Sequence, residues 1–167
     1  TEHMPDMERL IEWLPSTLPE QTRTSVVHGD YRIDNMIWAK DEPKVLAVLD
    51  WELSTLGDPM GDFSYVAMAW VTENGGRSGV ADLDRKAMGI PELDEVVERY
   101  CEKAGRSNVP DMNWLFAYNF FRLAGILQGI KKRVIDGTAS SAHAKEQSSK
   151  VQPLINRATE FAKLAGM

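Results

Sequence analysis

The sequence has one cysteine and few histidines, which removes several kinds of site from consideration. Cys101 stands alone, so neither a disulfide framework nor a cysteine metal site is expected, and we interpret it as an inert residue of a helix. The histidines His3, His28 and His143 form no pair at His-Glu-x-x-His spacing, so no zinc site is expected either. No apolar run approaches the ~18 residues of a membrane span, and no secretory leader is visible. We therefore expect a cytoplasmic protein with no membrane partner.

The chain also lacks an excess of positive charge. Its formal net charge is -6, whereas a surface that binds nucleic acid needs basic patches, so we expect no nucleic-acid partner. One basic cluster, residues 131–133, falls late in a predicted helix, where cations suit the helix dipole, and we interpret it as a solvated face. The length of 167 residues and the hydrophobic content of 43% suit a single globular domain over residues 1–167 with its own core.

Glycine-rich phosphate-binding motifs are absent from the sequence as well. It contains neither Gly-x-Gly-x-x-Gly nor Gly-x-x-x-x-Gly-Lys-Ser/Thr. The one glycine-dense segment, residues 75–79, lies between two predicted helices rather than after a strand. We therefore interpret this segment as a loop and not as a cradle for nucleotide phosphates.

The sequence does contain a set of polar residues suited to phosphoryl transfer. Asp30 and Asn35 are five residues apart, as the Asp and Asn are in the protein-kinase catalytic loop, and Asp50 follows fifteen residues after Asn35. In such a set, one Asp positions the attacking hydroxyl and accepts its proton, while an Asn and a second Asp hold magnesium on the phosphates of ATP. We therefore predict Asp30 as the catalytic base and Asn35 and Asp50 as magnesium ligands.

The segment between Asn35 and Asp50 predicts a hairpin that brings these two residues together. Residues 36–39 and 45–49 are apolar and predict strands, and residues 41–44 predict the turn that joins them. Asn35 then begins one arm and Asp50 ends the other, so both lie at the same end of the ribbon. Magnesium prefers a few hard oxygen ligands from protein, which an amide and a carboxylate supply.

With these residues the sequence resembles the aminoglycoside phosphotransferase and choline kinase family of small-molecule kinases, and within it most closely the kinase-like domain fused to some acyl-CoA dehydrogenases. The resemblance implies a protein-kinase-like fold. Because no Gly-rich strand turn or strand lysine precedes the catalytic loop, we expect this chain to be the C-terminal lobe, with the N-terminal lobe absent. The resemblance covers residues 26–65 and rests on His28-Gly29-Asp30 with Asn35, Leu49-Asp50-Trp51-Glu52, Gly57-Asp58-Pro59 and Asp62.

The same resemblance implies that Asp62 fixes the catalytic loop by accepting hydrogen bonds from the loop's backbone N–H groups. His28 is interpreted as a packed, hydrogen-bonded support of this loop rather than as a base. Arg32 either neutralises the transferring phosphate or pairs with Asp34 or Glu52.

Three further residues near these motifs have less definite roles. Asp58 either caps the helix that follows it or contributes near the metal. Trp38 and Trp51 are expected to be core aromatics rather than a stacking platform for a nucleotide.

We therefore expect an ATP-dependent phosphotransferase that moves the γ-phosphoryl group to a hydroxyl of a small molecule, with Mg²⁺ as cofactor. The resemblance implies a hydroxyacyl compound, an aminoglycoside, choline or another amino alcohol as acceptor. The alternative is a non-catalytic kinase-like fragment or binding module, since this chain alone is expected to be inactive. Such a lobe would expose an apolar surface and could self-associate. A metal-dependent hydrolase using Asp30 and Asp50 is disfavoured because its ligands are few and include no His.

The hydrophobic periodicity predicts a mostly helical α+β fold with one small hairpin at the active site. A strand is expected at 25–28, the hairpin at 35–50 and a loop at 50–59. The apolar residues of 110–136 nearly encircle that helix, so we expect it to be buried. The helical stretches are expected at 6–14, with Pro15 after its end, and at 61–73, 91–104, 110–136 and 139–165, the last with a break at Pro153; residues 74–89 are expected to be a loop or short helix.

Overall fold

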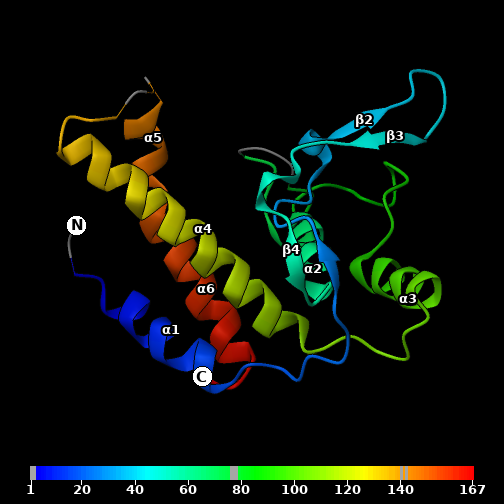
Figure 1. Cartoon of the computed structure of the whole chain (residues 1–167), viewed down its shortest axis with the longest axis horizontal. Helices are drawn as coiled ribbons and strands as arrows, with labels where there is room; N and C mark the ends of the chain where they lie inside the picture. The colour runs from blue at the N-terminus through cyan, green and yellow to red at the C-terminus, as the bar shows by residue number, and fades with distance from the viewer. Residues whose placement is uncertain (1–2, 76–78, 140, 142) are drawn as a thin grey trace. The chain divides into compact units, whose positions relative to one another are not determined.

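The computed structural model describes residues 3–75, 79–139, 141 and 143–167, so most of the glycine-dense segment predicted as a loop lies outside it. The described part of the chain is mostly helical with two small antiparallel sheets, which confirms the expected α+β class. Figure 1 shows the elements along the chain. They are α1 (Pro5–Ser16), β1 (Ser25–Val27), η1 (Ile33–Asn35), β2 (Met36–Trp38), β3 (Val45–Val48), η2 (Trp51–Leu53), β4 (Thr55–Gly57), α2 (Met60–Ala67), η3 (Met68–Val71), α3 (Leu93–Ala104), α4 (Met112–Ile135), α5 (Ala144–Ser149) and α6 (Val151–Leu164), where η marks a 3-10 helix.

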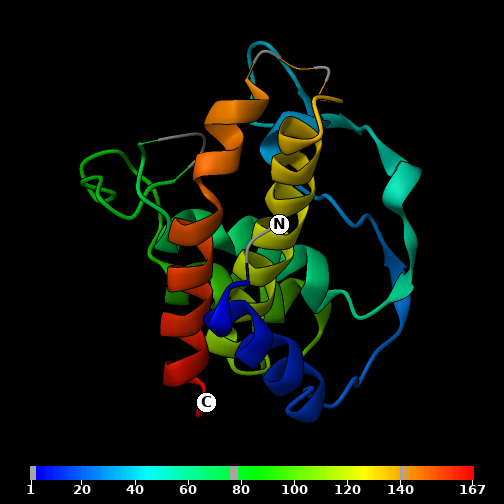
Figure 2. The same cartoon turned by 90° about the vertical axis from the view of Figure 1, so that its left-hand side faces the viewer.

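The chain divides into two compact units, here called the helical unit (residues 1–19 and 110–167) and the site unit (residues 20–109). In the helical unit, α6 lies along α4, and α1 packs against both, as the two views in Figures 1 and 2 show. Burial of apolar side chains between these helices supplies most of their stability, because isolated helices are marginal in water. One buried cluster joins all three helices and consists of Met4, Met7, Ala124, Val151 and Ile155.

The long helix α4 is buried mainly in its first half. Trp114, Phe116 and Phe120 lie in the core there, and Asp111 caps the helix by accepting a hydrogen bond from the Asn113 N–H at 2.9 Å. The prediction that the whole helix is central is wrong for its second half, where Ile126 is 51% exposed and Ile135 is 63% exposed. Apolar residues all round a helix indicate burial only where neighbouring elements cover every side.

Two prolines occur inside helices that were predicted to end or break at them. α6 continues through Pro153, which occupies its third position; the first N–H groups of a helix have no intrahelical acceptor, so proline costs no hydrogen bond there. The separation of α5 from α6 falls at Lys150 instead. α1 likewise includes Pro15 in its last turn rather than ending before it.

The site unit contains both sheets. β2 and β3 form the predicted hairpin, with Met36 opposite Val48 and Trp38 opposite Val45. β1 pairs with β4, which lies in the segment predicted as a loop; this sheet joins residues about thirty positions apart, a pairing that no local pattern encodes. The predicted helix 61–73 is divided into α2 and η3.

The chain between Asn74 and Pro91 has no regular element among its described residues and leads into α3. A capping box starts α3: the Glu92 side chain accepts from the backbone of Glu95, whose own side chain accepts from the Glu92 N–H at 2.7 Å. Gly105, in the left-handed conformation, ends this helix. No helix in the described ranges is both long and apolar enough to cross a membrane.

Candidate active site

The loop that begins at His28 is held by the carboxylate of Asp62 in the first turn of α2. Oδ2 of Asp62 accepts a hydrogen bond from the His28 N–H at 2.6 Å, and Oδ1 accepts one from the Gly29 N–H at 2.9 Å. Hydrogen bonds to an ionised acceptor are stronger than neutral ones. The structure thus brings Asp62 against the loop as the resemblance implied, while its effect on a reaction stays a prediction.

The imidazole of His28 is 1% exposed and uses both ring nitrogens inside the protein. Nε2 lies 2.6 Å from the Leu49 carbonyl oxygen, and Nδ1 lies 3.2 Å from the Asp30 backbone N–H. Because a carbonyl only accepts and an N–H only donates, these contacts select the tautomer that is protonated at Nε2. His28 therefore connects the loop to the end of β3, and neither nitrogen is available to accept a proton from a substrate.

The backbone at Gly29 has a conformation and an environment that favour glycine. Its φ is +83°, in the left-handed region that side-chain-bearing residues rarely adopt. A Cβ atom at this position would lie 2.6 Å from the backbone oxygen of Leu53. The loop can therefore turn against η2 only because residue 29 has no side chain.

Asp30 and Asn35 are in direct contact. The Nδ2 group of Asn35 donates to the backbone oxygen of Asp30 at 2.9 Å and to its carboxylate Oδ2 at 3.0 Å. Among the residues that the structure describes, neither the amide oxygen of Asn35 nor Oδ1 of Asp30 has a hydrogen-bond partner, so the first can serve as a ligand atom and the second as an acceptor.

Asp50 lies at the same end of the hairpin as Asn35. The Leu49 N–H donates to the Asn35 carbonyl at 2.8 Å, which closes the mouth of the hairpin just before Asp50. Asp50 has φ 67° and ψ 51°, and no other non-glycine residue in the described chain has a positive φ. Its carboxylate is exposed and has no hydrogen-bond or ion-pair partner among the residues that the structure describes. Strained backbone of this kind occurs preferentially at functional sites.

Arg32 pairs with Asp34, one of the partners that the sequence allowed. Burial opposes the charged form of Arg32, but the hydrogen bond and the negative charge of Asp34 outweigh this, so the pKa of Arg32 lies above its usual value. Arg32 therefore carries its charge within the loop between Asp30 and Asn35, and a contact with a transferring phosphate stays a prediction.

Asp58 lies at the start of α2, where its Oδ1 accepts from the Met60 N–H at 2.9 Å; this favours the capping alternative. Trp51 packs its ring 4.8 Å from that of His28 and donates from Nε1 to the Val48 carbonyl at 2.9 Å. Trp38 and Trp51 are 46% and 48% exposed, so the prediction that both are core aromatics is wrong. Trp38 lies on the two-stranded ribbon, which has no second layer to cover it, whereas Trp51 lies in η2 after the ribbon.

The residues at the hairpin mouth fit the chemistry of a magnesium site. The amide oxygen of Asn35 and the carboxylate of Asp50 are hard oxygen donors, and magnesium typically takes one or two such protein ligands together with substrate phosphates and water. Within the described ranges, no group of three His, Cys, Asp or Glu residues is arranged to hold a metal by itself. The candidate set depends on an asparagine and would be completed by phosphate oxygens.

Residues 2–107 match a family described as the phosphotransferase enzyme family. The chain is 44% identical to acyl-CoA dehydrogenase family member 10 of Mus musculus, over 99% of this chain and 16% of the relative. It is 36% identical to acyl-CoA dehydrogenase family member 11 of Gallus gallus, over 96% of this chain and 21% of the relative.

Among solved structures, a candidate aminoglycoside phosphotransferase from Ralstonia eutropha JMP134 superimposes with a TM-score of 0.92 at 49% sequence identity. The superposition covers 98% of this chain and 50% of that one. The chain thus spans half the length of this solved relative and about a fifth or less of the two curated relatives.

Proposed function

The chain belongs to the phosphotransferase enzyme family, as its motifs predicted, and we propose that it carries the catalytic loop of an ATP-dependent phosphotransferase that acts on a hydroxyl of a small molecule. The contact between Asp30 and Asn35, with Asp50 following the residue that pairs with Asn35 at the same end of the hairpin, is the observation that supports this proposal. In the proposed site, a carboxylate acceptor and two hard oxygen ligands would act together on the phosphates and the acceptor hydroxyl.

In the proposed mechanism, Asp30 orients the acceptor hydroxyl and accepts its proton. The Asn35 amide holds Oδ2 of Asp30 at 3.0 Å, so Oδ1 is the oxygen that would accept the proton. The Asn35 amide oxygen and the Asp50 carboxylate would hold magnesium, which when bound neutralises the negative charge of the phosphates. Asp62 and His28 keep Asp30 in position through the loop backbone.

For the acceptor we propose a hydroxylated acyl compound. Two of the relatives are named acyl-CoA dehydrogenase family members, which favours an acyl group, including a coenzyme A thioester, over an aminoglycoside. A hydroxyl on such a compound is a sufficient nucleophile once a carboxylate accepts its proton.

The proposal is tested by measuring phosphoryl transfer from ATP to a panel of hydroxyacyl compounds and amino alcohols. The assay uses a full-length polypeptide, meaning one that contains this chain together with the expected N-terminal lobe. Replacement of Asp30 by Ala should lower kcat by roughly 10²–10⁴-fold, the usual contribution of a general base. Asp41→Ala is the matched control, because Asp41 is an exposed aspartate in the turn of the same hairpin.

Two results would contradict the proposal. Turnover retained in Asp30→Ala would remove Asp30 from the role of base. If calorimetry finds no magnesium-dependent binding of ATP to the full-length polypeptide, the alternative of a non-catalytic binding module is correct instead.

A further inference from the structure

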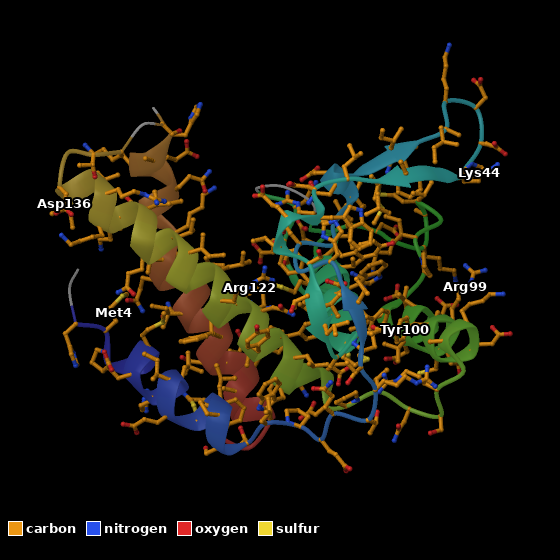
Figure 3. The ribbon with its side chains drawn as sticks, viewed as in Figure 1. Met4, Lys44, Arg99, Tyr100, Arg122 and Asp136 are labelled. Atoms are coloured by element: carbon orange, nitrogen blue, oxygen red, sulfur yellow. The ribbon has the colours of Figure 1, made fainter. Side chains whose placement is uncertain are left out.

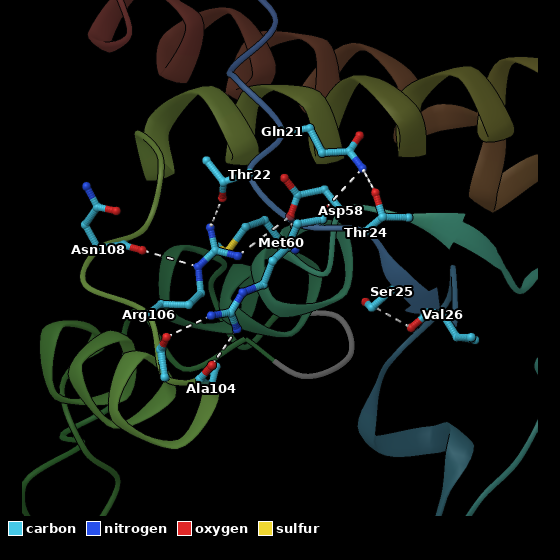
Figure 4. A network of polar contacts seen from close by, with 12 residues as sticks. Gln21, Thr22, Thr24, Ser25, Val26, Asp58, Met60, Ala104, Arg106 and Asn108 are labelled. Carbon is cyan, nitrogen blue, oxygen red and sulfur yellow. Dashed lines mark hydrogen bonds and ion pairs between the residues drawn. The ribbon is translucent and has the colours of Figure 1, made fainter.

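Arg106 is a buried cation that the proposed mechanism does not use. It follows the end of α3, and its side chain is 6% exposed. Nη2 donates to the Thr22 hydroxyl at 3.2 Å and Nε to the Asn108 carbonyl at 3.3 Å (Figure 4). Burying a guanidinium is costly unless partners compensate for the lost water, so a residue placed in this way must be held by its surroundings.

The third nitrogen of this guanidinium connects to the start of α2. Nη1 of Arg106 is buried and makes no hydrogen bond within the described chain; the oppositely charged atom that it faces is Oδ1 of Asp58, at 4.0 Å. The same oxygen accepts the hydrogen bond from the Met60 N–H at 2.9 Å. The positive charge of Arg106 therefore lies close to Oδ1 of Asp58, the oxygen that accepts a hydrogen bond from the N–H of the first residue of α2.

A second contact joins the same two helices. The ring of Phe63 on α2 stacks on that of Tyr100 on α3, with centroids 3.9 Å apart and an interplanar angle of 17°. Asp62, the neighbour of Phe63, holds the N–H groups of His28 and Gly29. The position of α2 against α3 thus decides where the Asp62 carboxylate meets the loop.

The chain just before β1 is attached to the end of α3 as well. Arg23 donates from Nη1 to the Ala104 carbonyl at 2.5 Å and from Nη2 to the Gly105 carbonyl at 2.8 Å. These carbonyls lie at the carboxyl end of α3, where a cation also suits the helix dipole. Together with the Thr22–Arg106 bond, this fixes the chain just before β1 to the end of α3.

We propose that Arg106 is a positioning residue for the catalytic loop. Its guanidinium donates a hydrogen bond to Thr22, which precedes β1, and faces the carboxylate of Asp58, which precedes α2. These contacts keep the Asp62 carboxylate within hydrogen-bond distance of the N–H groups of His28 and Gly29. The kinetic consequence rests on the proposed phosphotransferase function. The structural consequence does not, since it concerns only the hydrogen bonds between Asp62 and the loop.

The test is amide hydrogen exchange of the purified protein, read at His28 and Gly29 and, for comparison, along α6. Arg106→Met should speed exchange at the two loop amides by about tenfold and leave α6 within about twofold of the unmodified protein. Arg99→Met is the matched control, because Arg99 is an exposed arginine of α3, labelled in Figure 3, and has no polar partner in the described chain. Arg106→Lys, which keeps the charge facing Asp58, should restore most of the protection.

Asp58→Asn removes the charge at nearly constant size and should give the same local change even if Arg106→Met does not fold. In the double variant, exchange at His28 and Gly29 should be no faster than in the single variant with the larger effect, because both changes break the same pair. In the full-length enzyme, Arg106→Met should lower kcat by about tenfold while the KM for ATP stays within about twofold.

Equal exchange rates at the two loop amides in Arg106→Met and Arg99→Met would overturn the inference. An increase in the exchange rate along α6 as large as that in the loop would do so as well. Additive effects of Asp58→Asn and Arg106→Met on loop exchange would also contradict it. If the full-length protein shows no phosphoryl transfer, the proposed function fails, and the exchange data alone still decide the role of Arg106.

Discussion

The replacement of Gly29 by alanine is expected to destabilise the protein strongly for a change of one methyl group. The φ of +83° places residue 29 in the left-handed region, where a side chain costs roughly 1–2 kcal/mol. The added Cβ would also lie 2.6 Å from the Leu53 backbone oxygen, which no rotamer change can relieve. Forcing the backbone apart at such a contact costs roughly 1–3 kcal/mol, so the free energy of unfolding should fall by about 2–5 kcal/mol.

Urea-induced unfolding followed by circular dichroism measures this loss, with Gly61→Ala as the matched control. Gly61 lies in the first turn of α2, has no positive φ and has no neighbouring atom within 4 Å of the position of an added Cβ. Alanine favours helix over glycine, so Gly61→Ala should stabilise the protein by up to about 1 kcal/mol. The same glycine-to-alanine change is therefore expected to lower the free energy of unfolding at residue 29 and to raise it at residue 61.

Loop displacement should also reduce turnover in Gly29→Ala, because residue 29 lies between the support at His28 and the predicted base at Asp30. If Gly29→Ala unfolds at the same urea concentration as Gly61→Ala, an added Cβ at residue 29 does not clash with the Leu53 backbone oxygen as described. The argument that glycine is required there then fails with it.

Two further predictions concern the helices. Burial raises the pKa of Tyr100 above its ordinary 10.0, so the folded protein keeps the phenol protonated at a pH where the unfolded chain loses the proton. The stability that this shift contributes is fully present below the unfolded pKa and is lost as the pH rises through the folded pKa. Thermal melts from pH 8 to about 11 should therefore show a smaller loss of Tm in Tyr100→Phe than in the unmodified protein. Ile155 is fully buried in the cluster with Met4 and Met7, so Ile155→Ala should cost about 2–5 kcal/mol of unfolding free energy in urea titrations, and a cost below about 1 kcal/mol would contradict the packing of α6 on α1 and α4.

The hairpin and the contact between Asp30 and Asn35 could be predicted because their signals are local, while a role of this loop in catalysis stays a prediction. The turn at 41–44 and the apolar runs on either side of it determine the pairing of β2 with β3, and that pairing determines that Asn35 and Asp50 share one end of the ribbon. The helices followed from apolar periodicity and from residues such as Gly105, whose left-handed conformation ends α3.

Other features depend on contacts between residues that are distant in the sequence. β4 has three residues and becomes a strand only because β1 lies beside it. Arg106 contacts Thr22 across 84 positions, and no spacing rule links an arginine after one helix to a threonine before a strand. The exposure of Trp38 and Trp51 likewise depends on which elements cover these side chains, which composition does not specify.

The left-handed backbone at Asp50 restricts that position in a second way, independent of any metal. Glycine, asparagine and aspartate are the residues that occupy this conformation with least strain, and aspartate alone among them has a negative charge. Local geometry and charge therefore select the same amino acid. Of the substitutions that neutralise residue 50, those to asparagine and glycine are therefore expected to preserve the shape of the hairpin mouth best.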